Sequence, residues 1–306
     1  MNSPQKYLII GGSTKCGTTS VFNYFEFHPA ICRCRLKESR FFLEPAYQIA
    51  AAERRHRNIS FASLFNGCKP GQTGLEATPD YLYSETALSR IQNELPEAQM
   101  VFILRDPVER LISWFRFARM NGLIDQKLSF DDYVQMQNSA ADTKHLPQQL
   151  KSLQQGNYFP YLQRYIQSLG SNRVGVFLYE QLASEPELFC KSICSYSQLD
   201  PEYFTRFDFK IYNRSAETKS PGFHMMFRRL KRSVRPATRK LPEGLRKKLK
   251  LAGHSLEATV VQLNAGASAQ PVQPSKATLK FLHAYYKESN HQLSEYLKID
   301  LPWASE

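Results

Sequence analysis

Residues 6–20 read KYLIIGGSTKCGTTS. The stretch 6–10 is short and apolar, as in a buried parallel strand, and 11–17 is a turn bounded by glycines. From 18 to about 27, apolar residues recur at a helical spacing. A strand, a glycine-bounded turn and a helix in this order are typical of a phosphate-binding loop, because the N–H groups at the start of a helix attract anions.

The lysine of this loop stands in an unusual position. Loops that bind nucleoside triphosphates follow the pattern G-x-x-x-x-G-K-[ST]. Gly12, Gly17 and Thr19 keep that spacing, but Thr18 replaces the lysine, and Lys15 stands two residues before the second glycine. The loop therefore predicts phosphate binding without the lysine that reaches the β- and γ-phosphates.

A second junction between a strand and a helix carries an arginine. The apolar stretch 99–104 (QMVFIL) predicts a buried strand that ends at Arg105. A triphosphatase places an aspartate directly after this strand to organise Mg²⁺. The helix that follows is predicted to have Asp106 as its N-cap, Pro107 in its first turn and Glu109 as the partner in a capping box. The arginine adds a cation where the magnesium ligand would stand, so we expect a nucleotide other than a magnesium triphosphate.

The wider pattern predicts the fold class. Further strands are expected at 73–77 and 173–178, and helices at 84–95, 187–196 and 275–297. Strands that alternate with helices indicate a parallel sheet covered on both faces. We therefore predict an α/β fold that is P-loop-like, with three layers and a central parallel sheet flanked by helices. Ligands of such sheets bind at the carboxyl ends of the strands.

Composition bears on the compartment and the cysteines. No apolar run approaches the ~20 residues of a membrane-spanning helix, and the first residues lack the shape of a signal peptide. We expect a protein made and kept in the cytoplasm, where it could lie peripherally at the membrane. The six cysteines include no CxxC pair and no zinc-binding spacing, so reduced, buried thiols are expected, with a disulfide between two of them as the alternative.

The net charge of +12 is unevenly spread along the chain. The segment 220–250 holds eleven Lys or Arg and one acid, and its apolar residues recur at the spacing of a basic amphipathic helix. Such a segment favours polyanions or an anionic membrane. We expect 223–250 to bind an anionic membrane surface and expect no specific nucleic acid. The chain is expected to be one domain over 1–306 with a basic insertion at about 214–270, whose small, polar composition favours mobility.

Several stretches now carry a family resemblance. The stretch GGSTKCGTTS resembles the 5′-phosphosulfate loop of sulfotransferases that use 3′-phosphoadenosine 5′-phosphosulfate (PAPS), and MVFILRDPVERLISWF resembles their 3′-phosphate element. LKESRFF at 36–42 resembles the K-E-x-x-F-F stretch of heparan sulfate and related bacterial sulfotransferases. GLEATPDYL, NYFPYLQRYIQSLGSNRVGVFLYEQLASEP and LKFLHAYYKESNHQLSEYLKIDLPW follow in the family's order, so the resemblance covers most of the chain apart from about 214–270.

Two departures from the family's pattern stand out. Ser39 and Arg40 replace the frequent Pro-His after the glutamate, and no Lys-Gly-Arg stretch precedes the last helix.

The resemblance implies roles for particular residues. Arg105 and Ser113 would hold the 3′-phosphate, and Glu38 would be the catalytic base. Lys15 would stabilise the charge on the bridging oxygen. The 5′-phosphosulfate would be held by the loop residues Lys15, Cys16, Gly17, Thr18 and Thr19. The rival bases are Glu76, Asp80 and His28, and the candidate substrate contacts are Lys37, Glu76 and Asp80. No metal is required.

We therefore predict a transferase, a PAPS-dependent O-sulfotransferase that acts on a hydroxyl of a carbohydrate or lipid-linked acceptor such as a glycolipid. Two alternatives stay open. A P-loop nucleotide kinase would bind magnesium-ATP, which Thr18 and Arg105 disfavour. A non-catalytic basic protein that binds membranes or polyanions would leave the two phosphate elements without a role.

Overall fold

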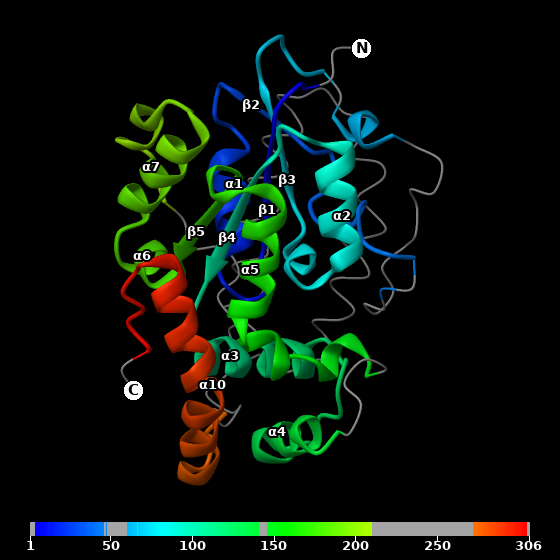
Figure 1. The fold of residues 1–306 in the computed structure, drawn as a ribbon, viewed down its shortest axis with the longest axis vertical. Helices are drawn as coiled ribbons and strands as arrows, with labels where there is room; N and C mark the ends of the chain where they lie inside the picture. The colour runs from blue at the N-terminus through cyan, green and yellow to red at the C-terminus, as the bar shows by residue number, and fades with distance from the viewer. Residues whose placement is uncertain are drawn as a thin grey trace, which may run out of the picture.

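The computed structural model of the chain describes residues 4–45, 47, 60–65, 67–140, 146–209 and 272–304. A parallel sheet forms its centre, with strand order β2-β3-β1-β4-β5 (Figure 1). The strands are β1 (Tyr7–Gly12), β2 (Ile31–Arg33), β3 (Thr73–Ala77), β4 (Gln99–Leu104) and β5 (Val174–Leu178).

The α-helices of the described part are α1 (Thr18–Phe25), α2 (Glu85–Glu94), α3 (Pro107–Met120), α4 (Phe130–Asn138), α5 (Tyr158–Leu169), α6 (Tyr179–Ser184), α7 (Pro186–Ser197) and α10 (Lys276–Leu297). Short 3₁₀ helices include η1 (Phe61–Leu64) and η2 (Pro79–Tyr83). Others lie at Gln148–Leu150, Gln154–Gly156, Ser171–Arg173 and Pro201–Phe204.

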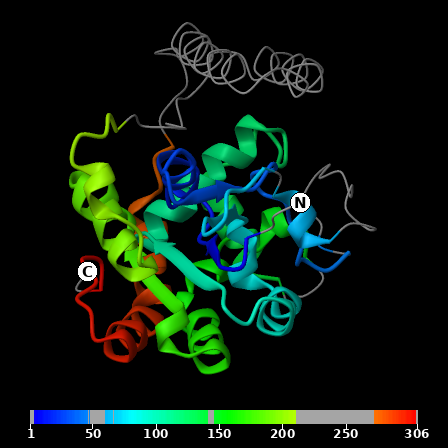
Figure 2. The same cartoon turned by 90° about the horizontal axis from the view of Figure 1, so that it is seen from above.

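Side chains of the central strands are buried on both faces of the sheet. Leu8 and Ile10 of β1 pack in a core with α1, α6 and α7, whereas Ile9 packs in a second core with α2, α5 and the end of α10. Figure 2 shows α1 and α7 on one side of the sheet and α2 and α5 on the other. The predicted class, a P-loop-like α/β fold with helices on both faces of a parallel sheet, is confirmed.

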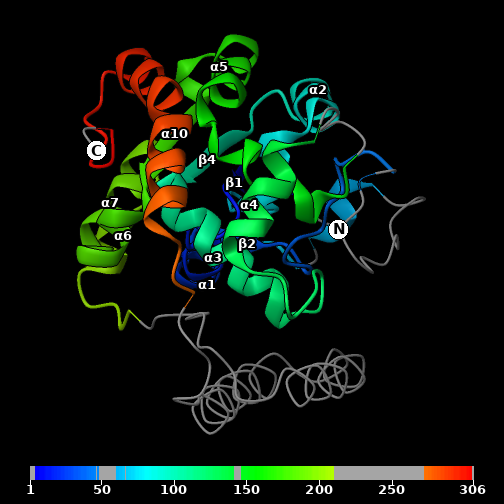
Figure 3. The same cartoon turned by 90° about the horizontal axis from the view of Figure 1, so that it is seen from below.

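A third core lies beyond the carboxyl ends of the strands. It joins α3 and α4 to α10 through buried side chains such as Phe115, Tyr133 and Tyr286. Figure 3 looks onto this end of the molecule, where α3 and α4 lie across the strand ends. Because β4 runs directly into α3, the arginine between them is fixed at the edge where ligands of parallel sheets bind.

The predicted elements agree closely with the structure. The strands at 73–77 and 99–104 have the expected bounds, β1 runs two residues further than expected, and β5 begins one residue later. The predicted helices at 84–95, 187–196 and 275–297 are present within two residues at each end. The basic insertion at about 214–270 and the amphipathic segment in it lie outside the described residues.

The cysteine prediction needs a correction. Cys32 and Cys68 form a disulfide with a Cα–Cα distance of 5.4 Å, whereas Cys16, Cys34, Cys190 and Cys194 are free and buried. The bond joins the edge strand β2 to the loop that precedes β3. Within the described ranges, no helix is long and apolar enough to span a bilayer.

Candidate functional site

The phosphate loop leads from β1 into α1, and the N-cap position of this helix carries no capping side chain. Gly17 occupies the N-cap position with a left-handed backbone (φ 77°), and no side chain caps the helix there. A Cβ at this position would lie 2.6 Å from Cδ2 of Leu182, and L side chains rarely adopt this positive φ, so the position favours glycine. The first turn of α1 contains no acidic residue. Its N–H groups are therefore arranged to attract an anion.

The loop is held in place by hydrogen bonds to β4 and to the 3₁₀ helix η2. The Ser13 N–H donates to the Ile103 carbonyl at 2.8 Å, and the hydroxyls of Ser13 and Tyr83 are 2.7 Å apart. Cys16 is fully buried, and this burial raises the pKa of its thiol to about 11. Its side chain is thus a neutral packing group, and only its backbone is available to a ligand. Thr18 is also buried, whereas Thr19 is half-buried.

Lys15 places a cation at the loop in a second left-handed backbone position (φ 70°). Its Nζ lies 4.6 Å from the centroid of the Phe117 ring on α3. Burial lowers the pKa of Lys15 to about 8, and the charge of Arg105 acts in the same direction. The two cations proposed from sequence are thus close enough to repel each other, which favours an anion between them.

Arg105 stands at the carboxyl end of β4 as predicted. Its guanidinium lies 4.7 Å from the centroid of the Tyr179 ring, and Nη2 pairs with Oε2 of Glu109 at 3.1 Å. The side chain of Glu109 is half exposed, so this ion pair is open to water and weak. Tyr158 donates its hydroxyl hydrogen to the Arg105 carbonyl at 2.8 Å. The backbone at this position is therefore fixed, and 19% of the Arg105 side chain is exposed.

The start of α3 agrees with prediction in one detail and differs in another. Asp106 is the N-cap, since its Oδ1 accepts from the Val108 N–H at 2.8 Å. The capping box is wrong, because the Asp106 N–H donates to Oε1 of Glu180 and Glu109 pairs with Arg105 instead. Ser113, on the same helix, is buried. Its role at a 3′-phosphate stays a prediction.

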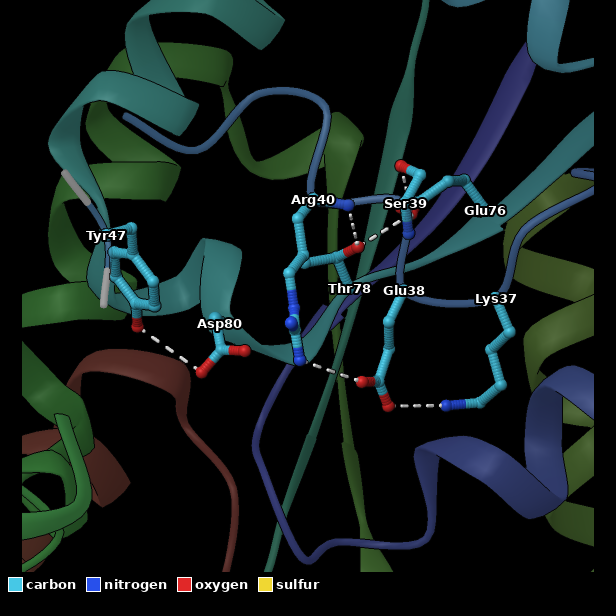
Figure 4. A network of polar contacts seen from close by, with 8 residues as sticks. All are labelled: Lys37, Glu38, Ser39, Arg40, Tyr47, Glu76, Thr78 and Asp80. Atoms are coloured by element: carbon cyan, nitrogen blue, oxygen red, sulfur yellow. Dashed lines mark hydrogen bonds and ion pairs between the residues drawn. The ribbon is translucent and has the colours of Figure 1, made fainter. Parts of the chain in front are cut away.

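Glu38 is presented by a short turn beside the end of β3 (Figure 4). Its carboxylate accepts from Nζ of Lys37 at 2.8 Å and from Nη2 of Arg40 at 3.4 Å. Burial acts to raise the pKa of Glu38, but the charges of Lys37 and its neighbours outweigh it and leave the pKa below the usual range. Lys15 is one of those neighbours. The structure therefore brings the predicted base to the predicted loop lysine as an ionised carboxylate, and 38% of its side chain is exposed.

Glu76 lies beneath that turn and has no exposed surface. Its Oε1 accepts from the Ser39 N–H at 3.1 Å, the Ser39 hydroxyl at 2.8 Å and the Thr78 hydroxyl at 2.7 Å. Burial raises the pKa of Glu76 to about 7, although the hydrogen bonds from Thr78 and Ser39 act in the opposite direction. Glu76 thus exposes no surface to a substrate in this structure, and its candidate role as a substrate contact stays a prediction.

Asp80, the other acidic candidate, is buried, with 8% of its surface exposed. Its Oδ1 accepts from the Tyr47 hydroxyl at 3.3 Å. Burial raises the pKa of Asp80 to about 6, although the nearby Arg40 charge acts in the opposite direction. Figure 4 shows Tyr47 and Asp80 on one side of Arg40, with Glu38 and Lys37 on the other. This line of polar side chains can hydrogen-bond a polyhydroxylated molecule.

His28, a rival base, has a structural role. It is 2% exposed, its Nε2 lies 3.0 Å from the Asp200 carbonyl, and its Nδ1 accepts from the Ala30 N–H at 3.1 Å. His28 lies shortly after the end of α1 and directly before Pro29.

Sequence reasoning missed several partners of these residues. Tyr179 and Glu180 follow β5 directly, so the rule that carboxyl ends of strands meet at one edge could have found them. Nothing in the pattern indicated that Phe117 would lie under Lys15, because a phenylalanine on an amphipathic helix is usually a core residue. Among the described residues there is no cluster of three metal-ligating side chains, and the expectation that no metal is needed stays a prediction.

The chain is similar to a known protein family. The family model described as "Sulfotransferase domain" matches residues 5–207. The chain is 26% identical over 207 residues to the bifunctional heparan sulfate N-deacetylase/N-sulfotransferase 4 of Mus musculus, a match that covers 65% of this chain and 23% of that protein. It is 32% identical over 111 residues to the membrane-associated sulfotransferase kil1 of Dictyostelium discoideum, covering 36% of this chain and 22% of that protein. The chain thus spans about a quarter of the length of these relatives.

A solved structure supports the fold. A sulfotransferase from Alicyclobacillus acidocaldarius matches with a TM-score of 0.69 and 18% identity, and the match covers 100% of both chains. At this identity the likeness shows the architecture and leaves the substrates open.

Proposed function

Because this chain belongs to the sulfotransferase domain family, we propose that it transfers a sulfuryl group from PAPS to an acceptor hydroxyl on a carbohydrate or glycolipid. One observation carries the proposal. Lys15 lies in a loop before an uncapped helix, and Arg105 lies close to it at the end of the neighbouring strand β4. A donor with a phosphosulfate at one end and a phosphate at the other needs two such cationic positions.

Each end of the donor has a suitable partner. The N–H groups of 15–19 and the ammonium of Lys15 would hold the 5′-phosphosulfate. Arg105 suits the 3′-phosphate because its planar guanidinium can bind two oxygens at once. The phosphate would replace Glu109, a half-exposed partner that is easily displaced.

The transfer itself needs one proton acceptor and one cation. The acceptor oxygen attacks sulfur, the bond from sulfur to the bridging oxygen breaks, and the electron pair stays on the departing phosphate. Lys15 would stabilise that growing charge, an electrostatic contribution that is often the largest in catalysis. The hydroxyl proton would pass to the ionised Glu38, a general-base contribution of roughly 10²- to 10⁴-fold.

The acceptor class follows from the polar side chains around Glu38. Lys37, Arg40 and Asp80 offer both donors and acceptors, which suits the hydroxyls and acidic groups of a carbohydrate. The similarity to heparan sulfate N-sulfotransferases supports a carbohydrate and also raises an amino group as the nucleophile. An acceptor panel should therefore contain both nucleophiles.

The proposal extends to a membrane surface. The segment 223–250 is strongly basic, and one similar protein is named a membrane-associated sulfotransferase. Basic amphipathic segments bind anionic lipid headgroups. In a sedimentation assay at low salt, the protein should pellet with phosphatidylserine vesicles and should stay in the supernatant with phosphatidylcholine vesicles.

The function is tested by incubating the protein with ³⁵S-labelled PAPS and a panel of sugars, glycolipids, phenols, and amino sugars with free or acetylated amines. We expect label on a carbohydrate or glycolipid hydroxyl. Lys15→Ala and Glu38→Gln should each lower the rate by about 10²-fold or more. Glu187→Gln, on the surface of α7 and paired with Lys191, is the matched control.

Four results would count against the proposal. Transfer that is unaffected by Lys15→Ala would remove the loop assignment, and full activity of Glu38→Gln would place the base elsewhere. Label found only on free amines would replace O-sulfation by N-sulfation. Phosphoryl transfer from magnesium-ATP in place of sulfuryl transfer would favour a kinase.

A further inference from the structure

The turn that carries Glu38 has an unfavourable backbone. Glu38 and Arg40 both adopt left-handed conformations, with φ of 57° and 56°, on either side of Ser39. Residues other than glycine rarely adopt this conformation because the Cβ crowds the following carbonyl. Two such residues in three persist only when the surroundings impose them. The question is therefore what holds this turn in place.

Three consecutive N–H groups of the turn are tied to three consecutive residues at the end of β3. The Glu38 N–H donates to the Ala77 carbonyl at 2.8 Å, the Ser39 N–H to Oε1 of Glu76 at 3.1 Å, and the Arg40 N–H to Oγ1 of Thr78 at 3.1 Å. The first is an ordinary backbone contact. The other two depend on side chains, and we call Glu76 and Thr78 the clamp.

The two members of the clamp are also joined to each other. Thr78 donates its hydroxyl hydrogen to Oε1 of Glu76 at 2.7 Å, and the Ser39 hydroxyl donates to the same oxygen at 2.8 Å. Oε2 of Glu76 has no hydrogen-bond partner within the described part of the chain. The carboxyl group thus makes its hydrogen bonds through Oε1, to Ser39 of the turn and to Thr78.

Because the clamp is buried, the conformation of the turn depends on its hydrogen bonds. Glu76, Thr78 and Ser39 are 0%, 0% and 7% exposed, so water cannot replace a missing partner. We propose that Glu76 is a positioning residue for sulfuryl transfer, whose Oε1, together with Thr78, fixes the left-handed turn that directs Glu38 toward Lys15. This inference rests on the proposed function, and it gives a fully buried acid a defined task that does not require contact with the substrate.

The position of the clamp in the sheet supports this role. Glu76 of β3 is paired with Ile9 of β1, the strand that runs into the phosphate loop. The turn and the loop are therefore both anchored to adjacent, buried strands. A shift of about 1 Å between reacting groups can cost on the order of 10²-fold in rate. A rigid link between the two segments is what such a reaction needs.

The test separates an acceptor oxygen from a proton acceptor at position 76. Glu76→Gln keeps an oxygen that can accept from Ser39 and Thr78 but cannot serve as a base, whereas Glu76→Leu removes the oxygen. We expect Glu76→Gln to keep kcat near wild type and Glu76→Leu to lower kcat by roughly 10²-fold. The affinity for adenosine 3′,5′-bisphosphate should be unchanged in both variants. Glu76 and Thr78 make their side-chain hydrogen bonds to the turn and to each other, and not to the residues proposed to bind PAPS.

A second pair guards against a variant that fails to fold. Thr78→Val keeps the shape of the side chain without the hydroxyl, and Thr78→Ser restores the hydroxyl. Thr78→Val should lower kcat and Thr78→Ser should recover it, again with unchanged nucleotide affinity. Full activity of both Glu76→Leu and Thr78→Val would overturn the proposal. A loss of activity in Glu76→Gln as large as that in Glu38→Gln would also overturn it, because Glu76 would then be acting as the base.

Amide hydrogen exchange tests the clamp independently of any activity. In Glu76→Leu, exchange in 36–42 should accelerate while exchange in 13–19 stays as in the wild type. Unchanged exchange in 36–42 would overturn the inference even in an active enzyme. If the wild-type protein transferred no sulfuryl group, the proposed function would fail, and the exchange result would still report on the clamp.

Discussion

The surroundings of Lys15 disfavour its positive charge. Burial and the neighbouring Arg105 lower its pKa to about 8 in the free protein. Glu38, across the site, has a pKa below its usual range because Lys37 and other cations outweigh the effect of burial. Lys15 and Glu38 therefore carry the charges that their proposed roles require, ammonium and carboxylate, around neutral pH.

This pairing predicts a pH profile. The value of kcat/KM should fall as the pH rises through about 8, because Lys15 then loses its proton and its charge. Lys15→Arg should remove that alkaline limb, since arginine stays charged. The profile is measured as the initial rate of sulfuryl transfer at low PAPS concentration.

The acid limb of the same profile identifies the base. If Glu38 is the base, activity should persist as the pH falls to below 4.5, since a carboxylate with a lowered pKa stays ionised there. A limb near pH 6 would indicate Asp80 instead, and one near pH 7 would indicate Glu76. Either result would contradict the assignment of Glu38.

At the scale of residues, the sequence indicated which side chains belong to the site better than it indicated how buried they are. Lys15 and Arg105 were recognisable because their spacing from glycines and from a strand end defines their place. Glu76 and Ser113 were named as candidates, but their burial depends on what packs above them. For Glu76 this is the turn at 38–40, whose conformation comes from contacts across the sheet and not from local propensity.

At the scale of elements, the strands were predictable because they are buried on both faces and read as continuous apolar runs. The edge strand β2 is three residues long and carries no such signal. Helices α4 and α5 were not predicted either. Both are fixed mainly by packing at the ends of the sheet, against α3 in one case and α2 and α10 in the other.

The disulfide between Cys32 and Cys68 is a second feature of this scale. It closes a segment with a sequence separation of 36, which includes the Glu38 turn. By the loop-entropy estimate such a bond contributes roughly 3–4 kcal/mol to the free energy of unfolding. Reduction with dithiothreitol should therefore lower Tm by several degrees, as measured by calorimetry, and Cys32→Ser should show the same lowered Tm without reductant.

A matched control and a contrary result are available. Cys190→Ser changes a free, buried thiol and should make Tm no more sensitive to reductant than in the wild type. Six titratable thiols in protein purified without reductant would show that the bond does not form. Because disulfides are rare in the cytosol, a persistent bond would count against the cytoplasmic location expected from the sequence.

At the scale of the whole molecule, the fold unites two junctions that are distant in sequence. The β1–α1 and β4–α3 junctions become neighbours because β1 and β4 are adjacent in the sheet. The β3 end brings the Glu38 turn to the same edge, since β3 lies on the other side of β1. The order of the elements was readable from the sequence, but the order of the strands in the sheet was not.

The central claim is that these junctions bind the two phosphorylated ends of one adenosine nucleotide. Isothermal titration calorimetry with adenosine 3′,5′-bisphosphate, in the absence of Mg²⁺, tests it most directly. We expect binding that Arg105→Ala weakens by roughly 10- to 100-fold, the equivalent of about 1.5–3 kcal/mol for charge-assisted hydrogen bonds. Adenosine 5′-phosphate, which lacks the 3′-phosphate, should bind both proteins equally. A protein that ignores the bisphosphate and binds magnesium-ATP would contradict the account.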